Sequence, residues 1–269
     1  MPGFPWAAFL SSLPWTAAAL AVLLAGTFAV AVRQNRHCVM DTVWGSGFVL
    51  VAVVSWLLSA GQGDDGRRLL LLVLVAVWGF RLSVHIGLRA RGGHEDPRYV
   101  DLLASAPGSR NAYALRRVYI PQGVVLFFVS LPVQVGMFGT GGLGWLAVPG
   151  VLLWLLGTAF ETVGDRQLAQ FKADPARRGT VLNTGLWRYT RHPNYFGDAA
   201  VWAGLFLIAA DSWPGVLTVL SPALMIWILA GKTGKPLTEK AMSARPGYQE
   251  YIESTSGFLP LPPRRGQPN

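Results

Sequence analysis

Apolar residues in this chain gather into long runs, and these runs constrain the fold more than any other feature. A transmembrane helix needs about 20 consecutive, predominantly apolar residues to cross the bilayer core. In lipid its backbone polar groups must also be satisfied internally, as they are in a helix. We predict seven membrane-spanning helices, at about 15–32, 43–60, 69–88, 119–137, 144–161, 195–210 and 213–230. The sixth is short for a span, so the last two segments could instead form a shallow hairpin. The predicted fold is an all-α, polytopic membrane helix bundle in which residues 1–269 form a single domain.

The balance of residue types supports a membrane protein. Hydrophobic residues make up 52% of the chain and charged residues only 14%, whereas a soluble domain carries about 25% charged residues. The first apolar run lacks a basic segment before it, so we interpret it as a retained anchor and not as a cleaved signal peptide.

The distribution of basic residues predicts the orientation. Arg67 and Arg68 fall between the second and third spans, where Asp64 and Asp65 offset them. Nearly all the other Lys and Arg residues lie on the opposite side, in the segments 33–36, 89–118, 166–194 and 231–269. The positive-inside rule therefore places the N-terminus outside, and the loops 89–118 and 166–194 and the tail 231–269 in the cytoplasm.

The net charge of +9 follows from this topology. No nucleic-acid-binding motif accompanies it, so the expected partners are membrane lipids and not nucleic acid. Cys38 is the only cysteine, which excludes an internal disulfide and a cysteine-based metal site. The richness in alanine, glycine and arginine favours a bacterial plasma membrane. Glycine-rich dinucleotide turns and P-loops are absent.

The segment 184–198 places a cluster of polar residues at the mouth of a predicted span. Pro193 suits the first turn of a helix, where free N–H groups and the helix dipole attract anions. Charge at a membrane boundary is costly unless it is paired, hydrated or bound to a ligand. The segment is therefore either an anion site or an internally paired cluster, and its polar side chains are Arg188, Arg191, His192, Asn194 and Asp198.

Three further groups of polar residues border the predicted spans. Glu161, Asp165 and Lys172 share one face of a helix by their spacing, and they form either a solvated helix end or a ligand-binding stripe. Arg81 and His85 also share a face, which we expect to point into the bundle, either paired with an acid or lining a polar cavity. Asp41 is either the cap of a helix start or an acid that lines such a cavity. Tyr99 is either a solvated loop residue or a further member of the cavity.

Two of these segments resemble a known superfamily. The residues Arg191-His192-Pro193-Asn194-Tyr195, with Gly197 and Asp198, resemble the signature of the membrane reductases that include steroid 5-alpha-reductases and sterol C14-reductases. Upstream, Glu161, Asp165, Gln167, Phe171 and Lys172 are similar to a second motif of the same superfamily. Within it, the chain is most similar to the DUF1295 branch over about residues 35–263, with further matches at Asp41, Trp44-Gly45, Trp78-Gly79, Glu95-Asp96, Arg98-Tyr99 and Pro246-Gly247-Tyr248.

The resemblance implies a helical membrane bundle with an NADPH pocket on its cytoplasmic side. It also implies reduction of a carbon–carbon double bond conjugated to a carbonyl, in a lipophilic, steroid-like substrate. Arginine binds phosphate groups bidentately, so Arg188 would add phosphate contacts. By position, the remaining residues expected to contact the cofactor are Asp165, Lys172, Arg191, His192, Asn194, Tyr195 and Asp198.

The catalytic residues are less clearly implied. Steroid reductases place a glutamate and a tyrosine over the substrate enone, and this chain has no clear counterpart of that pair. We predict Asp41, His85 and Tyr99 as substitutes, which would stabilise the negative charge that develops on the carbonyl oxygen and supply a proton. The substrate would enter from the bilayer, because apolar walls suit a lipophilic molecule.

Two alternatives remain open. Membrane methyltransferases of the isoprenylcysteine and phospholipid types share the Arg-His-Pro core and carry a glutamate in the tail, for which Glu239 is available here, although Lys240 replaces their second glutamate. Such an enzyme would bind S-adenosylmethionine. The stripe of Asp165 and Lys172 favours a reductase. The second alternative is a lipid-binding protein without catalytic activity, in which the polar cluster is structural.

Overall fold

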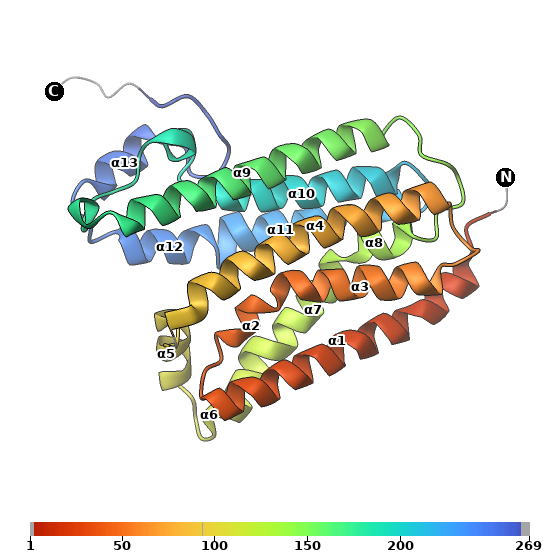
Figure 1. Cartoon of the computed structure of the whole chain (residues 1–269), viewed down its shortest axis with the longest axis horizontal. Coiled ribbons are helices and arrows are strands. Elements are labelled where there is room, and N and C mark those ends of the chain that lie inside the picture. The colour runs from red at the N-terminus through yellow and green to blue at the C-terminus, as the bar shows by residue number, and fades with distance from the viewer. Residues whose placement is uncertain (1–2, 93, 265–269) are drawn as a thin grey trace. The chain divides into compact units, whose positions relative to one another are not determined.

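The computed structural model describes residues 3–92 and 94–264, and within these ranges every regular element is a helix (Figure 1). The chain divides into two compact units. The first unit runs to Ala147 and includes Ile208–Ser221, and the second contains Val148–Leu207 and the residues from Pro222 onward.

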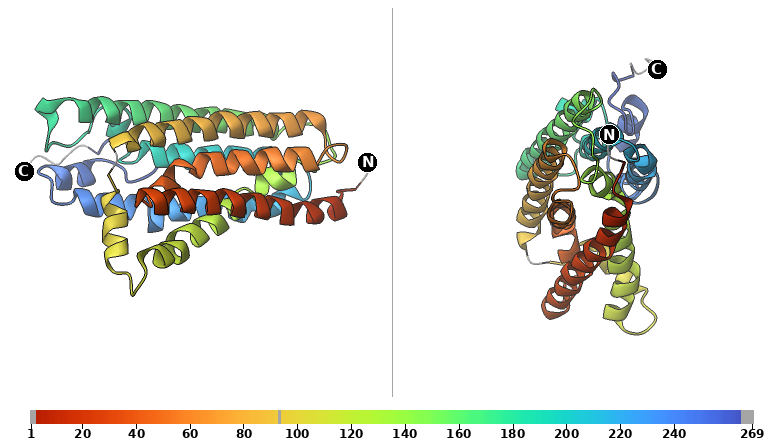
Figure 2. Two further views of the ribbon diagram at one scale, coloured as in Figure 1. Left: turned by 60° about the horizontal axis from the view of Figure 1, so that its bottom comes forward. Right: turned by 90° about the vertical axis from the view of Figure 1, so that its right-hand side faces the viewer.

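The first unit contains eight α-helices with short 3-10 and π-helical turns between some of them. Within this unit α3 packs between α1 and α4, as Figures 1 and 2 show. The elements are α1 (Trp6–Gln34), α2 (Val39–Thr42), α3 (Trp44–Leu58), α4 (Asp65–Arg89), a 3-10 turn (Ala90–Gly92), α5 (Pro97–Ala104), α6 (Arg110–Ala114), a π-helical turn (Leu115–Tyr119), α7 (Ile120–Val129), α8 (Leu131–Gly136) and a 3-10 turn (Gly215–Val219).

The second unit contains the helices that carry the polar motif and the tail. Its elements are α9 (Ala147–Ala173), 3-10 turns at Pro175–Arg177 and Gly185–Arg188, α10 (Pro193–Ala210), α11 (Leu220–Ile226), a π-helical turn (Trp227–Lys232), α12 (Lys235–Met242) and α13 (Tyr248–Ser254).

Five helical runs in the described residues are long and apolar enough to cross a membrane, which makes this an integral membrane protein. They are Trp6–Gln34, Asp65–Arg89, Arg110–Gly136, Ala147–Ala173 and Gly215–Met242. The predicted helical membrane fold is confirmed, but the predicted count of seven spans is not. All seven predicted segments lie on helical stretches, yet α3 and α10 are not among these five runs.

Helix α3 is shorter than the predicted segment 43–60. Its 15 residues rise about 22 Å, less than the roughly 30 Å of a bilayer core. The chain turns after Leu58, where Ser59 caps the helix and Gly61 adopts a φ of 70° that favours glycine. The predicted segment 43–60 therefore exceeds α3 by Val43 at its start and by Ser59 and Ala60 at its end.

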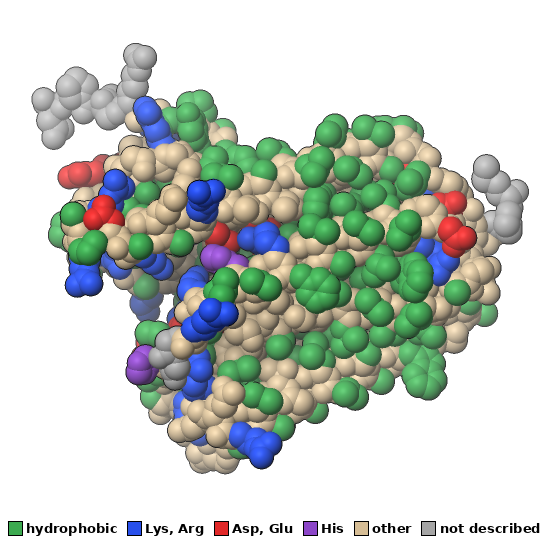
Figure 3. Space-filling model, viewed as in Figure 1, with side chains coloured by type: hydrophobic (Ala, Val, Ile, Leu, Met, Phe, Trp, Pro, Cys, Tyr) green, Lys and Arg blue, Asp and Glu red, His purple; other side chains and the backbone are tan. Residues whose placement is uncertain are grey.

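The lipid-facing surface is apolar, and the charges lie near the helix ends. In Figure 3, apolar side chains cover the exposed faces of α1, α3 and α4. Exposed Trp15, Val22, Leu57 and Phe80 belong to this surface. Such exposure suits contact with lipid tails and would be unusual on a soluble monomer.

Two glycines allow α3 and α4 to approach closely. A methyl group built on Gly79 would lie 2.6 Å from the carbonyl oxygen of Gly45, and the hydroxyl of Ser83 accepts a hydrogen bond from the backbone N–H of Ser46 at 2.8 Å. Small residues at such contacts let helix backbones pack against each other in membranes. The glycines next to Trp44 and Trp78 are therefore packing residues.

The buried amide of Gln134 and the carbonyl of Phe128, both in the first unit, are bonded to side chains from other parts of this unit. Gln134 is 1% exposed; its amide oxygen accepts from Thr16 at 3.0 Å, and its amide nitrogen donates to Ser130 at 2.9 Å. Pro132 has no N–H for the carbonyl of Phe128, which instead accepts from Ser221 at 2.8 Å. These bonds allow the break between α7 and α8 in an apolar environment.

We expect Gly79→Ala to destabilise the protein by about 1–3 kcal/mol, because the added methyl group forces α3 and α4 apart. Gly87→Ala is the matched control on the same helix, since a methyl group there meets no atom within 4 Å. Reversible unfolding in mixed detergent micelles measures both variants. Equal stability of the two would contradict the close contact.

Candidate functional site

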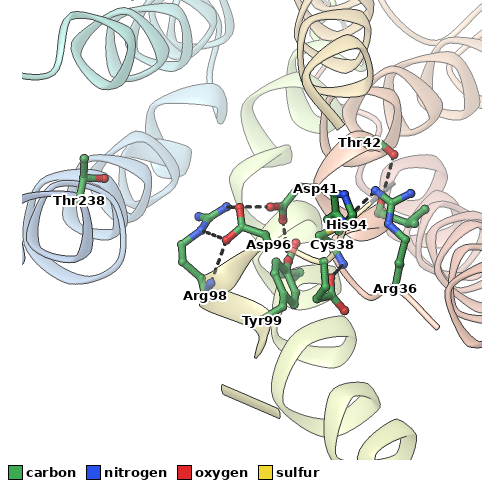
Figure 4. Close-up of polar contacts among 12 residues, drawn as sticks. Arg36, Cys38, Asp41, Thr42, His94, Asp96, Arg98, Tyr99 and Thr238 are labelled. Carbon is green, nitrogen blue, oxygen red and sulfur yellow. Dashed lines mark hydrogen bonds and ion pairs between the residues drawn. The ribbon is translucent and has the colours of Figure 1, made fainter. Parts of the chain in front are cut away.

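In the first unit, Asp41 of α2 and Tyr99 of α5 form a hydrogen-bonded pair. The Tyr99 hydroxyl donates to Oδ1 of Asp41 at 2.6 Å, and Arg98 donates to Oδ2 at 3.1 Å (Figure 4). Gln122 of α7 donates its amide N–H to the Tyr99 oxygen at 3.3 Å. The hydroxyl of Tyr99 is therefore held between one donor and one acceptor. We call these two residues the Asp41–Tyr99 pair.

Both members of the pair hold their protons more strongly than they would in water. Burial raises the pKa of Asp41, and the Tyr99 hydroxyl and the Arg98 guanidinium only partly oppose this. Burial also raises the pKa of Tyr99, which is 7% exposed, and the neighbouring Asp41 carboxylate raises it further. At neutral pH Tyr99 is a protonated hydrogen-bond donor in a largely desolvated place.

The start of α5 positions Tyr99. Asp96 is the N-cap, accepts from the backbone N–H of Arg98 at 2.9 Å, and is followed by Pro97 at the first helical position. Both features favour a helix start. Burial alone would raise the pKa of Asp96, but hydrogen bonds from Arg98 hold the pKa below its usual range. Arg98 therefore bridges two carboxylates, Asp96 at 3.0 Å and Asp41.

Glu95 joins the start of α5 to the start of α2. Its carboxylate accepts the backbone N–H groups of His37 at 2.7 Å and Cys38 at 2.8 Å, and a guanidinium N–H of Arg110 at 3.2 Å. Burial alone would raise the pKa of Glu95, but these donors hold it below its usual range. Glu95 is thus an anion satisfied on both oxygens. We call this arrangement the Glu95 junction.

The ring of His37 packs beneath this junction and is fully buried. Nε2 lies 3.1 Å from Oδ1 of Asn111, and Nδ1 lies 3.4 Å from the hydroxyl of Tyr119. An amide oxygen only accepts, so Nε2 carries the proton and Nδ1 accepts from Tyr119. The ring thereby ties the end of α1 to the segment before α7.

In the second unit, Glu239 of α12 contacts two residues of the polar motif. Its Oε1 lies 2.8 Å from Nε of Arg191 and 3.3 Å from Nε2 of His192. Nη1 of Arg191 also donates to the carbonyl oxygen of Ile252 at 2.9 Å. Arg191 is 7% exposed, so much of its charge is neutralised inside the protein. We call these residues the Arg191–Glu239 cluster.

His192 is neutral in this cluster. Burial lowers its pKa to about 4, although Glu239 opposes the shift. The His192 ring stacks on Tyr195 with ring centroids 5.1 Å apart and an interplanar angle of 11°. The Tyr195 hydroxyl lies 3.1 Å from Oγ1 of Thr238 on α12. Helix α12 therefore holds both His192 and Tyr195 in place.

The tail packs against the residues that precede α10. The Tyr251 hydroxyl donates to the carbonyl oxygen of Trp187 at 2.5 Å, and the Thr190 hydroxyl donates to that of Phe258 at 2.8 Å. The backbone N–H of Arg191 donates to the carbonyl oxygen of Ser256 at 2.9 Å. The segment 255–258 after α13 thus packs as part of this unit.

Helices α9 and α10 pack closely and bring two motifs together. A methyl group on Gly197 would lie 2.5 Å from the carbonyl oxygen of Gly157, and one on Gly164 would lie 3.0 Å from Cγ of Pro193. This contact places the α9 residues Glu161 and Asp165, both buried, beside the start of α10.

The other predicted site residues differ in exposure. Lys172 and Arg188 are exposed, whereas Asn194, Tyr195 and Asp198 are half-buried. His85 lies half-buried on α4, and its catalytic role stays a prediction. The structure brings Asp41 and Tyr99 together in one unit and Arg191, His192 and Tyr195 together in the other.

A cavity of about 230 Å³ lies in the second unit beside the end of α9. Arg177 lies over the Phe171 ring at 5.8 Å and pairs with Asp174 at 3.0 Å. Gln167 accepts from the backbone N–H of Leu186 at 3.0 Å. The cavity is smaller than a typical ligand pocket of roughly 300–1,000 Å³. Its lining residues are Gln167, Gln170, Phe171, Asp174, Arg177, Leu182, Thr184 and Gly185.

The sequence did not predict two of these site contacts. Gln122 is 23 residues from Tyr99 and belongs to no motif. The partners of Glu95 on the His37 side are backbone N–H groups, which leave no side-chain pattern. Glu239 was considered as a tail residue and in the methyltransferase alternative, but its contacts with Arg191 and His192 were not predicted.

The apolar helices define an integral membrane protein, and a partly buried acid–tyrosine pair lies on two short helices of its first unit. The chain belongs to the family described as "Protein of unknown function (DUF1295)", whose model matches residues 27–255. The resemblance stated from the motifs is therefore confirmed.

Two curated relatives support this placement. "3-oxo-5-alpha-steroid 4-dehydrogenase 1" of Bos taurus is 26% identical over 236 residues, which cover 80% of this chain and 81% of the relative. "Uncharacterized protein C594.04c" of Schizosaccharomyces pombe is 25% identical over 232 residues, covering 74% of this chain and 65% of that protein's own length. No solved structure matches the chain.

The depressed pKa of His192 predicts a pH dependence of stability. The folded-state pKa of about 4 lies below the unfolded value of 6.5, so the neutral ring favours the folded state. This contribution, up to about 3 kcal/mol, is present above pH 6.5 and is lost as the pH falls towards 4. We expect His192→Gln to flatten the dependence of unfolding free energy on pH in this window.

His94→Gln is the control for this measurement, because His94 is exposed. It should leave the pH dependence as it is in the wild type. A His192→Gln variant whose profile also overlays the wild type would show that His192 titrates normally.

Proposed function

We propose that this protein is a membrane reductase that reduces a carbon–carbon double bond conjugated to a carbonyl in a lipophilic, steroid-like substrate, with NADPH as hydride donor. The observation that carries the proposal is the 2.6 Å hydrogen bond between Tyr99 and Asp41. It supplies a partly buried acid–tyrosine pair in a chain that is similar to a 3-oxo-5-alpha-steroid 4-dehydrogenase.

The pair suits the electrostatic demand of such a reaction. When hydride adds to the β-carbon of an enone, negative charge develops on the carbonyl oxygen, and a positioned donor stabilises it. Tyr99 keeps its proton because burial raises its pKa, so it would donate to that oxygen. Gln122 and Asp41 would hold the hydroxyl in place. A proton then reaches the α-carbon, which completes a saturated ketone and leaves oxidised cofactor.

The second unit offers side chains that fit a dinucleotide. NADPH would bring hydride at its nicotinamide and negative charge at its phosphates. Lys172, Arg178 and Arg188 are exposed cations that would bind the phosphates. Because Arg191 is already bound to Glu239 of α12 and to the carbonyl oxygen of Ile252, we propose that it holds α12 and α13 against the start of α10. The remaining proposed cofactor residues are Asp165, His192, Tyr195 and Asp198.

The direct test is isotope transfer. Protein purified in lipid nanodiscs is incubated with NADPH that carries deuterium at the transferable position and with a panel of steroid and aliphatic enones. Mass spectrometry should find one deuterium in the saturated product. Absence of NADPH binding by the folded protein would overturn the proposal.

We expect Tyr99→Phe to lower kcat by about 10²–10³-fold, because a preorganised donor to the developing oxyanion is removed, while KM changes much less. Tyr113→Phe is the matched control; its hydroxyl lies on α6, where its ring contacts Arg117. A Tyr99→Phe enzyme that retained the wild-type rate would remove Tyr99 from the mechanism.

One observation favours a second candidate function. Glu239 contacts both Arg191 and His192, which are the residues shared with membrane methyltransferases that use a tail glutamate. Ligand binding raises the melting temperature by mass action. Stabilisation by S-adenosylmethionine and not by NADPH would select the methyltransferase, and the reverse result would select the reductase.

A further inference from the structure

Helix α2, which carries Asp41, lacks the means to fix its own position. It has only four residues, and the side chain of its N-cap residue, Cys38, makes no capping hydrogen bond to the helix backbone. A single helical turn is not stable alone, because fixing its backbone costs more conformational entropy than its few hydrogen bonds offset. The placement of Asp41 therefore depends on contacts from outside α2.

Glu95 supplies these contacts at the start of α2. It receives the N–H groups of His37 and Cys38, whose carbonyl oxygens in turn accept the N–H groups of Met40 and Asp41 at 3.1 Å. The two peptides that Glu95 holds are thus the two that begin the turn bearing Asp41.

Glu95 also fixes the start of α5. It directly precedes Asp96, the N-cap of α5, whose carbonyl oxygen accepts the N–H of Tyr99 at 2.8 Å. Arg110 binds the same carboxylate and donates to Asn35 at the end of α1. One carboxylate therefore joins the first turns of the two helices that carry the Asp41–Tyr99 pair.

We propose that Glu95 is a positioning residue that sets the separation between the Asp41 carboxylate and the Tyr99 hydroxyl. The proposal rests on the proposed function for its catalytic meaning, but the geometry it concerns can be measured without any substrate.

Substitution by glutamine separates charge from shape. Glu95→Gln keeps the side-chain length, but its amide group would turn an N–H donor towards the N–H of either His37 or Cys38, where the wild type has an acceptor. One of these bonds is lost, and the charge pair with Arg110 is lost too. The first turn of α2 is then released, and Asp41 is free to move away from Tyr99.

The readout is the titration of Tyr99 itself. Incorporation of 3-fluorotyrosine at position 99 of the full-length protein in nanodiscs gives a ¹⁹F signal that follows the phenol. We expect the ¹⁹F curve of Glu95→Gln to differ from the wild-type curve, with a changed chemical shift at neutral pH and an earlier onset of phenol titration, because the hydrogen bond to Asp41 is lost. In the same variant kcat should fall by about 10–100-fold with little change in KM, as misplacement of a catalytic group predicts.

Asp101→Asn is the matched control, since Asp101 is an exposed acid on the same helix as Tyr99. It should leave both the ¹⁹F titration and kcat unchanged. If Glu95→Gln does not fold, Arg110→Gln replaces it, because that variant keeps both backbone bonds and weakens only the hold on the carboxylate. A shift of the Tyr99 titration in the folded variant supports the proposal.

An unchanged Tyr99 titration in the folded variant overturns the positioning role, whatever the enzyme activity. A shifted titration in a protein that reduces no enone would support the positioning role and count against the proposed reductase. The two failures are therefore distinguishable.

Discussion

The absence of water within the membrane-spanning helices is the constraint on which the rest of this structure depends. Each polar group there must find a partner in the protein, or it costs several kcal/mol of unfolding free energy. The break at Pro132 is tolerated because Ser221 takes the carbonyl that the proline leaves without a donor. Gln134 is accommodated because Thr16 donates a hydrogen bond to its amide oxygen and Ser130 accepts one from its amide nitrogen.

The same constraint explains why the ionisable groups are joined in networks at the helix ends. In the first unit Asp41, Arg98 and Asp96 lie in one chain of contacts. The Arg191–Glu239 cluster and the Asp41–Tyr99 pair nevertheless suit different roles. Arg191 and Glu239 neutralise each other and hold a neutral histidine, which suits a scaffold. The Asp41–Tyr99 pair instead keeps a dissociable proton between two oxygens, which suits chemistry at a ligand.

The sequence predicted the helical membrane fold because apolar runs report lipid exposure directly. It placed the end of α3 two residues too late, because the small residues Ser59 and Ala60 do not mark where the helix ends before the turn at Gly61. It named Asp41 and Tyr99 separately, but no periodicity links residues that are 58 positions apart. The contact of Gln122 could not be predicted, because a single amide side chain belongs to no spacing pattern. The partners of Glu95 could not be predicted either, because they are peptide N–H groups, which every residue except proline has.

The motif residues of this chain divide into two physical kinds. Three glycines stand where two helix backbones approach so closely that a Cβ atom would not fit, and their role is this close approach: Gly45, Gly79 and Gly197. Glu95, Arg98 and Tyr99 stand where two short helices begin, so their role is to fix polar groups against each other. The close packing holds the long helices as a rigid frame, and only such a frame lets a four-residue helix carry an acid to a defined place. A site built on short helices then needs an internal anion such as Glu95 at its junction, because short helices cannot orient themselves.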